Sequence, residues 1–133
     1  MQDLLLASLL VLASANTQAA PAHTQRIPQF TNDQVAVWET IVYPSSRQIL
    51  KMHRHDYDRI IVAFDEGKIK IVNNKGQTHT LTLKKNKAYF LQKDKPGELH
   101  TDENISAHPV KVMVVELKHE PNDSTSKKPK NHS

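Results

Sequence analysis

Cysteine is absent from the 133 residues of this chain, and glycine and aromatic residues are scarce. The lack of cysteine excludes disulfide bonds, a thiol nucleophile, and zinc or iron–sulfur sites built on thiolates. With only three glycines and 5% aromatic residues, the chain offers little for Gly-rich phosphate-binding loops or for stacking of single-stranded nucleic acid. Any metal chemistry must therefore depend on the eight histidines.

Positive charge is in modest excess, with 18 Lys and Arg against 14 Asp and Glu and a net charge of +4 at pH 7. This charge is spread along the chain, and its densest cluster, Lys127 to Lys130, lies in a polar C-terminal segment. No recognition helix is indicated, so we expect no nucleic-acid partner. The length suits a single domain.

The N-terminal residues are typical of a secretory signal peptide. An apolar run from Leu4 to Ala15 is followed by small residues, and about a dozen apolar residues are too few to span a bilayer, which takes about 20. We expect a cleaved signal peptide over 1–20, a lead-in segment over 21–33, a domain over 34–118 and a disordered tail over 119–133. The protein should be periplasmic or secreted, without stable membrane insertion.

The hydrophobic pattern of residues 34–118 has a period of two, which predicts an all-β domain. The predicted strands are Val35–Tyr43, Ile49–His55, Arg59–Phe64, Lys68–Val72, Thr78–Leu83, Ala88–Leu91 and Val110–Leu117. In the last of these, alternate valines occupy one face. So many short strands indicate a closed antiparallel barrel or a small sandwich, because closure removes exposed sheet edges.

The clearest chemical signal is a pair of histidines two residues apart, His53 and His55. Residues at i and i+2 of a strand project from the same face, so both imidazoles can reach one metal ion. A third histidine, His100, follows a Pro-Gly turn far along the chain, and Asn104 comes four residues later. A ligand from a distant strand is what a metal site inside a barrel requires.

These residues resemble the two motifs of the cupin superfamily of small jelly-roll β-barrels. The matching positions are His53, His55 and Gly67 in the first motif, and Pro96, Gly97, His100 and Asn104 in the second. The resemblance covers almost all of 34–118 and points to exported single-domain cupins. It implies a divalent metal, which would be Fe, Mn, Ni, Zn or Cu, although metal-free cupin pockets are the alternative.

The chain departs from the cupin pattern at Arg59, where a glutamate usually follows the second histidine by four positions. Three outcomes are open. In the first, the guanidinium faces the imidazoles and opposes a divalent metal. In the second, a bulge turns Asp58 inward to replace the carboxylate. In the third, three histidines hold the metal while Arg59 binds an anionic substrate beside it.

Two further side chains are candidates for the pocket: Tyr57, which shares the parity of the two motif histidines, and His79. Two classes of function follow. The first is a metal-dependent cupin of dioxygenase or isomerase type that acts on a small, anionic molecule. The second is a metal-free module that binds a small acid or sugar without catalysis. A homodimer is compatible with both.

Overall fold

The computed structural model describes residues 22–118, and these residues form nine β-strands and no helix. The strands are β1 (Gln25–Thr31), β2 (Val35–Val42), β3 (Leu50–His53), β4 (Arg59–Ala63), β5 (Gly67–Asn73), β6 (Thr78–Leu83), β7 (Lys87–Leu91), β8 (His100–Asn104) and β9 (Val110–Leu117). No helix in this part of the chain has the length and apolar character needed to cross a membrane. The expected signal peptide and tail lie outside the described residues.

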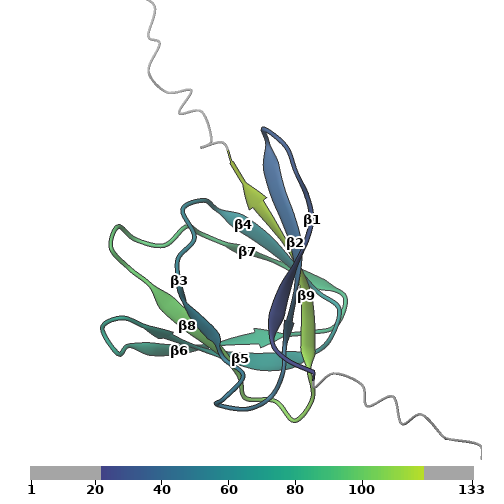
Figure 1. Ribbon diagram of the computed structural model, residues 1–133, viewed down its shortest axis with the longest axis vertical. Coiled ribbons are helices and arrows are strands. Elements are labelled where there is room, and N and C mark those ends of the chain that lie inside the picture. Colours follow the sequence, from purple (N-terminus) through teal and green to yellow (C-terminus); the bar gives the residue numbers. More distant parts are fainter. Residues whose placement is uncertain (1–21, 119–133) are drawn as a thin grey trace, which may run out of the picture.

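The strands form two antiparallel sheets, in the order β1-β2-β9-β4-β7 and β3-β8-β5-β6. Figure 1 shows the two sheets arranged around a common interior. Neighbouring strands in each sheet are mostly far apart in sequence, so the chain passes repeatedly from one sheet to the other. The predicted all-β antiparallel barrel is confirmed.

The core lies between the sheets and is built from alternate residues of the inner strands. On β9, Val110, Val112 and Val114 are buried, as the alternation predicted, and they face Ile61 and Ala63 of β4. Burying a valine side chain stabilises the fold by about 1.5–3 kcal/mol. The complete buried cluster is Val42, Ile61, Ala63, Ile69, Leu83, Val110, Val112 and Val114.

Two glycines of the cupin-like motifs are explained by the structure, Gly67 by lack of space and Gly97 by its backbone conformation. A Cβ at Gly67 would collide with the side chains of Val110 and Ser106, so only glycine fits where β5 begins. Gly97 has φ +75°, and the Glu98 N–H donates to the Lys95 carbonyl oxygen at 3.0 Å. Proline followed by a left-handed glycine is the signature of a type II turn. This turn leads the chain into β8.

Two strands were not predicted. β1 lies in the segment expected as a lead-in, where it pairs with β2 at the edge of the larger sheet. It carries Pro28, which only an edge strand or a bulge accepts, and a register shift follows that residue. β8 has the sequence His-Thr-Asp-Glu-Asn, which contains no large apolar residue and so gives no hydrophobic alternation.

Candidate metal centre

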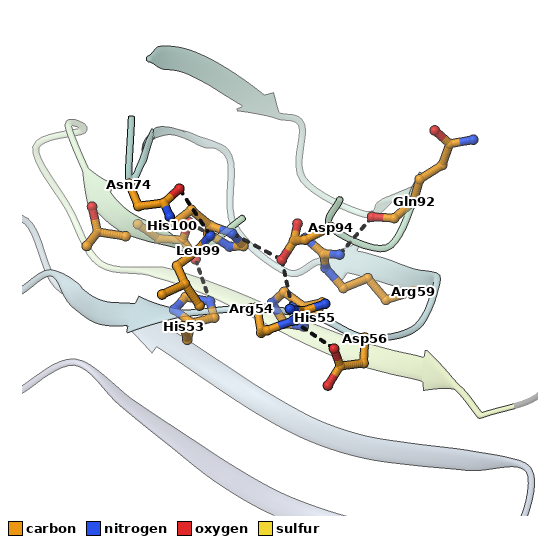
Figure 2. Close-up of polar contacts among 12 residues, drawn as sticks. His53, Arg54, His55, Asp56, Arg59, Asn74, Gln92, Asp94, Leu99 and His100 are labelled. Atoms are coloured by element: carbon orange, nitrogen blue, oxygen red, sulfur yellow. Dashed lines mark hydrogen bonds and ion pairs between the residues drawn. The ribbon is translucent and has the colours of Figure 1, made fainter. Parts of the chain in front are cut away.

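Three histidines converge inside the barrel. His53 is the last residue of β3, His55 follows two residues later, and His100 begins β8 opposite His53. One ring nitrogen of each lies within 4.8 Å of those of the other two. Figure 2 shows the three rings gathered together. The convergence that the motifs predicted is present, and a bound metal stays a prediction.

His55 is positioned by the β7–β8 loop. Its backbone N–H donates to Oδ2 of Asp94 at 2.6 Å, and the Asp94 N–H donates to the His55 carbonyl oxygen at 2.9 Å. The indole ring of Trp38 stacks parallel to the imidazole, with ring centroids 6.2 Å apart. The prediction that a strand reaches His55 is wrong, because β3 ends at His53 and Asp94 supplies the partner groups beyond it.

Each of the three rings has an acceptor facing its Nδ1 atom. These pairs are His53 with the Lys51 carbonyl oxygen at 2.7 Å, His55 with Glu116 Oε2 at 3.2 Å, and His100 with Asp94 Oδ2 at 3.3 Å. An acceptor at this position assigns the proton of a neutral imidazole to Nδ1 and leaves the lone pair on Nε2. All three rings therefore present a metal-binding Nε2.

Burial keeps two of these rings neutral. Desolvation lowers the pKa of His53, and it lowers the pKa of His55 to about 2 with the help of the nearby Arg59 guanidinium. Burial also raises the pKa of Glu116, the carboxylate beside His55. Neutral imidazole is the form that binds metal, so His53 and His55 need not lose a proton near pH 7.

The donor set fits a divalent transition-metal ion. Nε2 of His53 is buried and has no hydrogen-bond partner among the described residues, which is costly for a polar atom. A cation among the three Nε2 atoms would satisfy this lone pair. Imidazole nitrogen suits Fe, Mn, Ni, Zn and Cu, so the ligand type does not choose among them.

Arg59 points into the barrel. Residues Arg59, Ile61 and Ala63 are buried on alternate positions of β4, and the arginine side chain lines the same cavity as His55 and His100. Its Nη1 donates to the Gln92 carbonyl oxygen at 3.0 Å (Figure 2). The guanidinium therefore lies on the side of the imidazoles, as two of the three alternatives required.

The alternative in which a bulge turns Asp58 inward is not found. β4 pairs with β7 and β9 in unbroken register from Arg59 to Ala63, and Arg59 is the buried residue at its start. Asp58 Oδ1 instead accepts a hydrogen bond from the Lys93 N–H at 2.8 Å, in the β7–β8 loop. The structure does not bring Asp58 to the histidine cluster.

The structure does not bring the other candidates, Tyr57, His79 and Asn104, into the histidine cluster. Tyr57 is exposed and lies outside the residues that line the interior cavity. His79 is also exposed, on the wall of an outer cleft rather than at the cluster. Asn104 is buried, and its amide donates to the carbonyl oxygens of Val42 and His108 at 2.8 and 2.7 Å. Asn104 therefore anchors the end of β8 to the end of β2 and to the β8–β9 loop.

Four charged residues of the site were missed by the sequence analysis. Glu116 continues the inward alternation of β9, and Asp102 lies two residues after His100 on β8, so strand parity could have identified both. Asp94 lies in a loop and Arg26 on the unpredicted β1, where no pattern indicated them. The guanidinium of Arg26 lies 5.4 Å from the centre of the Trp38 ring.

The interior next to the histidines is hollow. A cavity of about 60 Å³ is lined by His55, His100, Arg59 and Asp102 together with core residues. An open cleft of about 460 Å³ shares Arg59 and His100 with this cavity and continues outward past His79. The cleft is within the usual size range of small-molecule sites, roughly 300–1,000 Å³.

Solved structures share this architecture. A cupin domain from Bordetella pertussis Tohama I is 22% identical, with a TM-score of 0.63, over 77% of this chain and 100% of that one. An RmlC-like cupin family protein from Methanocaldococcus jannaschii is 8% identical, with a TM-score of 0.56, over 83% of this chain and 94% of that one. A cupin superfamily protein from Desulfitobacterium hafniense is 10% identical, with a TM-score of 0.54, over 77% and 84%.

The fold is therefore that of the cupins, a double-stranded β-helix. No family model matches the sequence, and none of the curated proteins is significantly similar to it. Because one fold serves many activities, function has to be argued from the site.

Proposed function

We propose that this protein is a member of the cupin superfamily that holds one divalent metal ion on His53, His55 and His100 and uses it to bind a small anion. The single observation that carries the proposal is the arrangement of the three Nδ1 atoms, each of which faces an acceptor. This arrangement orients three Nε2 lone pairs toward one place before any ligand binds. When bound, such a metal supplies a Lewis acid with open positions.

The charges around the histidines favour a metal-dependent anion site over a metal-free one. Arg26 and Arg59 contribute two positive charges, and Asp94, Asp102 and Glu116 contribute three negative charges when ionised. With neutral imidazoles the site has one net negative charge, which repels an anion. A divalent cation changes it to one net positive charge, which attracts a monoanion.

Two groups would hold the anion beside the metal. Arg59 lines both the cavity and the cleft, and a guanidinium can donate two parallel hydrogen bonds to a carboxylate. The indole nitrogen of Trp38, another residue of the cavity wall, is buried without an acceptor in the described part of the chain. These two hydrogen-bond donors support a small acid as the ligand. They account for binding of the acid and do not by themselves imply a reaction.

Metal binding is the first expected result. Chelator-treated, untagged protein incubated with Mn²⁺ or Co²⁺ should bind about one ion per chain, measured by elemental analysis and calorimetry. His53→Ala and His100→Ala should each weaken metal binding at least about tenfold, because each substitution removes one of the three imidazole nitrogens that coordinate the ion.

The matched control is His108→Ala. His108 is exposed, and its Nε2 donates one hydrogen bond to the Glu66 carbonyl oxygen, away from the cluster. This variant should bind metal as the wild type does. A folded wild-type protein that stays metal-free would overturn the proposal, and so would cluster variants that bind metal as tightly as the wild type.

We also propose that the protein is exported, on the strength of the apolar run from Leu4 to Ala15. Mass spectrometry of protein isolated from its native host should find an N-terminus near Asn16 or Ala20. Recovery of the intact N-terminus from Met1 in the cytoplasm would contradict export. Homodimer formation stays a prediction.

A further inference from the structure

The carboxylate that the first motif lacks at position 59 has a counterpart on β8. His100, Asp102 and Asn104 occupy alternate positions of this strand and so share one face, and the first two line the interior cavity. His100 and Asn104 are buried, and the Asp102 side chain between them is 17% exposed. The strand therefore brings one carboxylate to the histidine cluster.

The distances from this carboxylate suit two ligands of one ion. Asp102 Oδ2 lies 3.6 Å from His53 Nε2, and Asp102 Oδ1 lies 3.7 Å from His100 Nε2. Both separations exceed a hydrogen bond, for which the donor and acceptor are 2.7–3.2 Å apart. Two ligands that each lie about 2.1 Å from one ion at a tetrahedral angle are about 3.4 Å apart.

The atoms concerned are also unsatisfied. Asp102 Oδ1 and His53 Nε2 are both buried, and neither has a hydrogen-bond partner among the described residues. A lone pair on a carboxylate and a lone pair on an imidazole cannot satisfy each other. A cation between them would satisfy both, and this is an independent sign of a missing positive group.

The other two carboxylates of the site are on the wrong side of the rings. Glu116 and Asp94 face the Nδ1 atoms of His55 and His100, where they orient the rings. Asp102 faces Nε2 atoms instead, on the side where a metal would bind.

We propose that Asp102 is the fourth protein ligand of the metal, in place of the carboxylate that Arg59 displaces from the first motif. This inference rests on the proposed function, because it assigns a further ligand to the same ion. The site is then three imidazoles and one carboxylate, with the carboxylate supplied by β8 instead of β4. The interior arginine becomes compatible with a divalent metal, since a carboxylate within reach of the ion offsets its charge.

The test compares Asp102→Asn with Glu103→Gln, two neutral replacements of nearly the same shape at neighbouring positions. Glu103 is the matched control because its side chain pairs with Lys70 at 2.5 Å, on the opposite face of β8. With Co²⁺ as the probe, Asp102→Asn should raise the dissociation constant at least about thirtyfold and alter the visible absorption spectrum of the bound ion. Glu103→Gln should stay within about threefold of the wild type and keep its spectrum.

Thermal unfolding separates a ligand from a merely structural residue. The metal-free Asp102→Asn protein should stay folded, while the rise in its melting temperature on adding Co²⁺ should be smaller than that of the wild type. Asp102→Ala has no side-chain oxygen. It should therefore lose the stabilisation by Co²⁺ even if the asparagine oxygen of Asp102→Asn still coordinates the ion weakly.

Equal Co²⁺ binding by wild type and both Asp102 variants, with loss only in the histidine variants, would overturn the role of Asp102 and leave the proposed function standing. Absence of Co²⁺ binding by the wild type would overturn both.

Discussion

Replacing Arg59 with glutamate should raise the affinity for Mn²⁺ or Co²⁺ on the order of 100-fold, because it changes the local charge by two units beside the ion. Arg59 is 6% exposed and lines the cavity of His55 and His100, so solvent screens this change little. The same substitution should weaken binding of azide, a probe monoanion, to the Co²⁺-loaded protein, since the guanidinium donors are lost. Calorimetry and absorption titration measure the two affinities.

Arg47→Glu is the control for reversal of charge, because Arg47 is exposed and lies in the turn before β3. It should leave both affinities within about threefold. Metal-free Arg59→Glu should be less stable than the wild type, because a fourth carboxylate joins Asp94, Asp102 and Glu116 while Arg26 is the one cation of the site that remains among the described residues. An unchanged or weaker affinity for the metal in Arg59→Glu would contradict an arginine that faces the ion.

The second large effect is a loss of stability in acid. The pKa of His55 falls from its ordinary 6.5 to about 2 on folding, mainly through burial. Below pH 6.5 the unfolded chain binds a proton that the folded chain refuses, so stability falls as the pH falls. Between about pH 7.5 and pH 5 this histidine alone should remove roughly 2 kcal/mol from the free energy of unfolding.

Other groups modify this profile. His53, whose pKa burial also lowers, adds a loss of the same sign. Glu116 acts oppositely at the acidic end, because its raised pKa lets the folded state take up a proton first. Urea unfolding with a chelator present measures the effect. His55→Gln should flatten the profile and His108→Ala should not, whereas a wild-type stability independent of pH from 7.5 to about 5 would refute the assignment.

Strand periodicity explains how much of the fold the sequence predicted. The alternating valines of β9 and the buried alternate residues of β4 belong to strands whose apolar faces are visible in the sequence. β8 was not predicted from the sequence, because its inward residues are His100, Asp102 and Asn104, which belong to a polar site instead of an apolar core. A strand that serves the site loses the hydrophobic signal by which strands are recognised.

The site was predictable only where ligands repeat at strand spacing or match a motif. His53, His55 and His100 were identified in this way. Asp94 was not, because its role depends on the path of the β7–β8 loop, which brings it to a residue 39 positions earlier. No local pattern records such a contact. Arg26 depends in the same way on an edge strand without clear alternation.

On β9 the three inward valines are followed on the same face by Glu116, which faces His55. A slip of one residue in the pairing of β9 with β2 and β4 would turn Glu116 outward and bring Lys111 and Met113 into the core. A barrel with this one-residue slip would thus lose both its valine core and the acceptor that fixes the His55 tautomer. The register that buries the β9 valines in the core is therefore also the register that places Glu116 at His55.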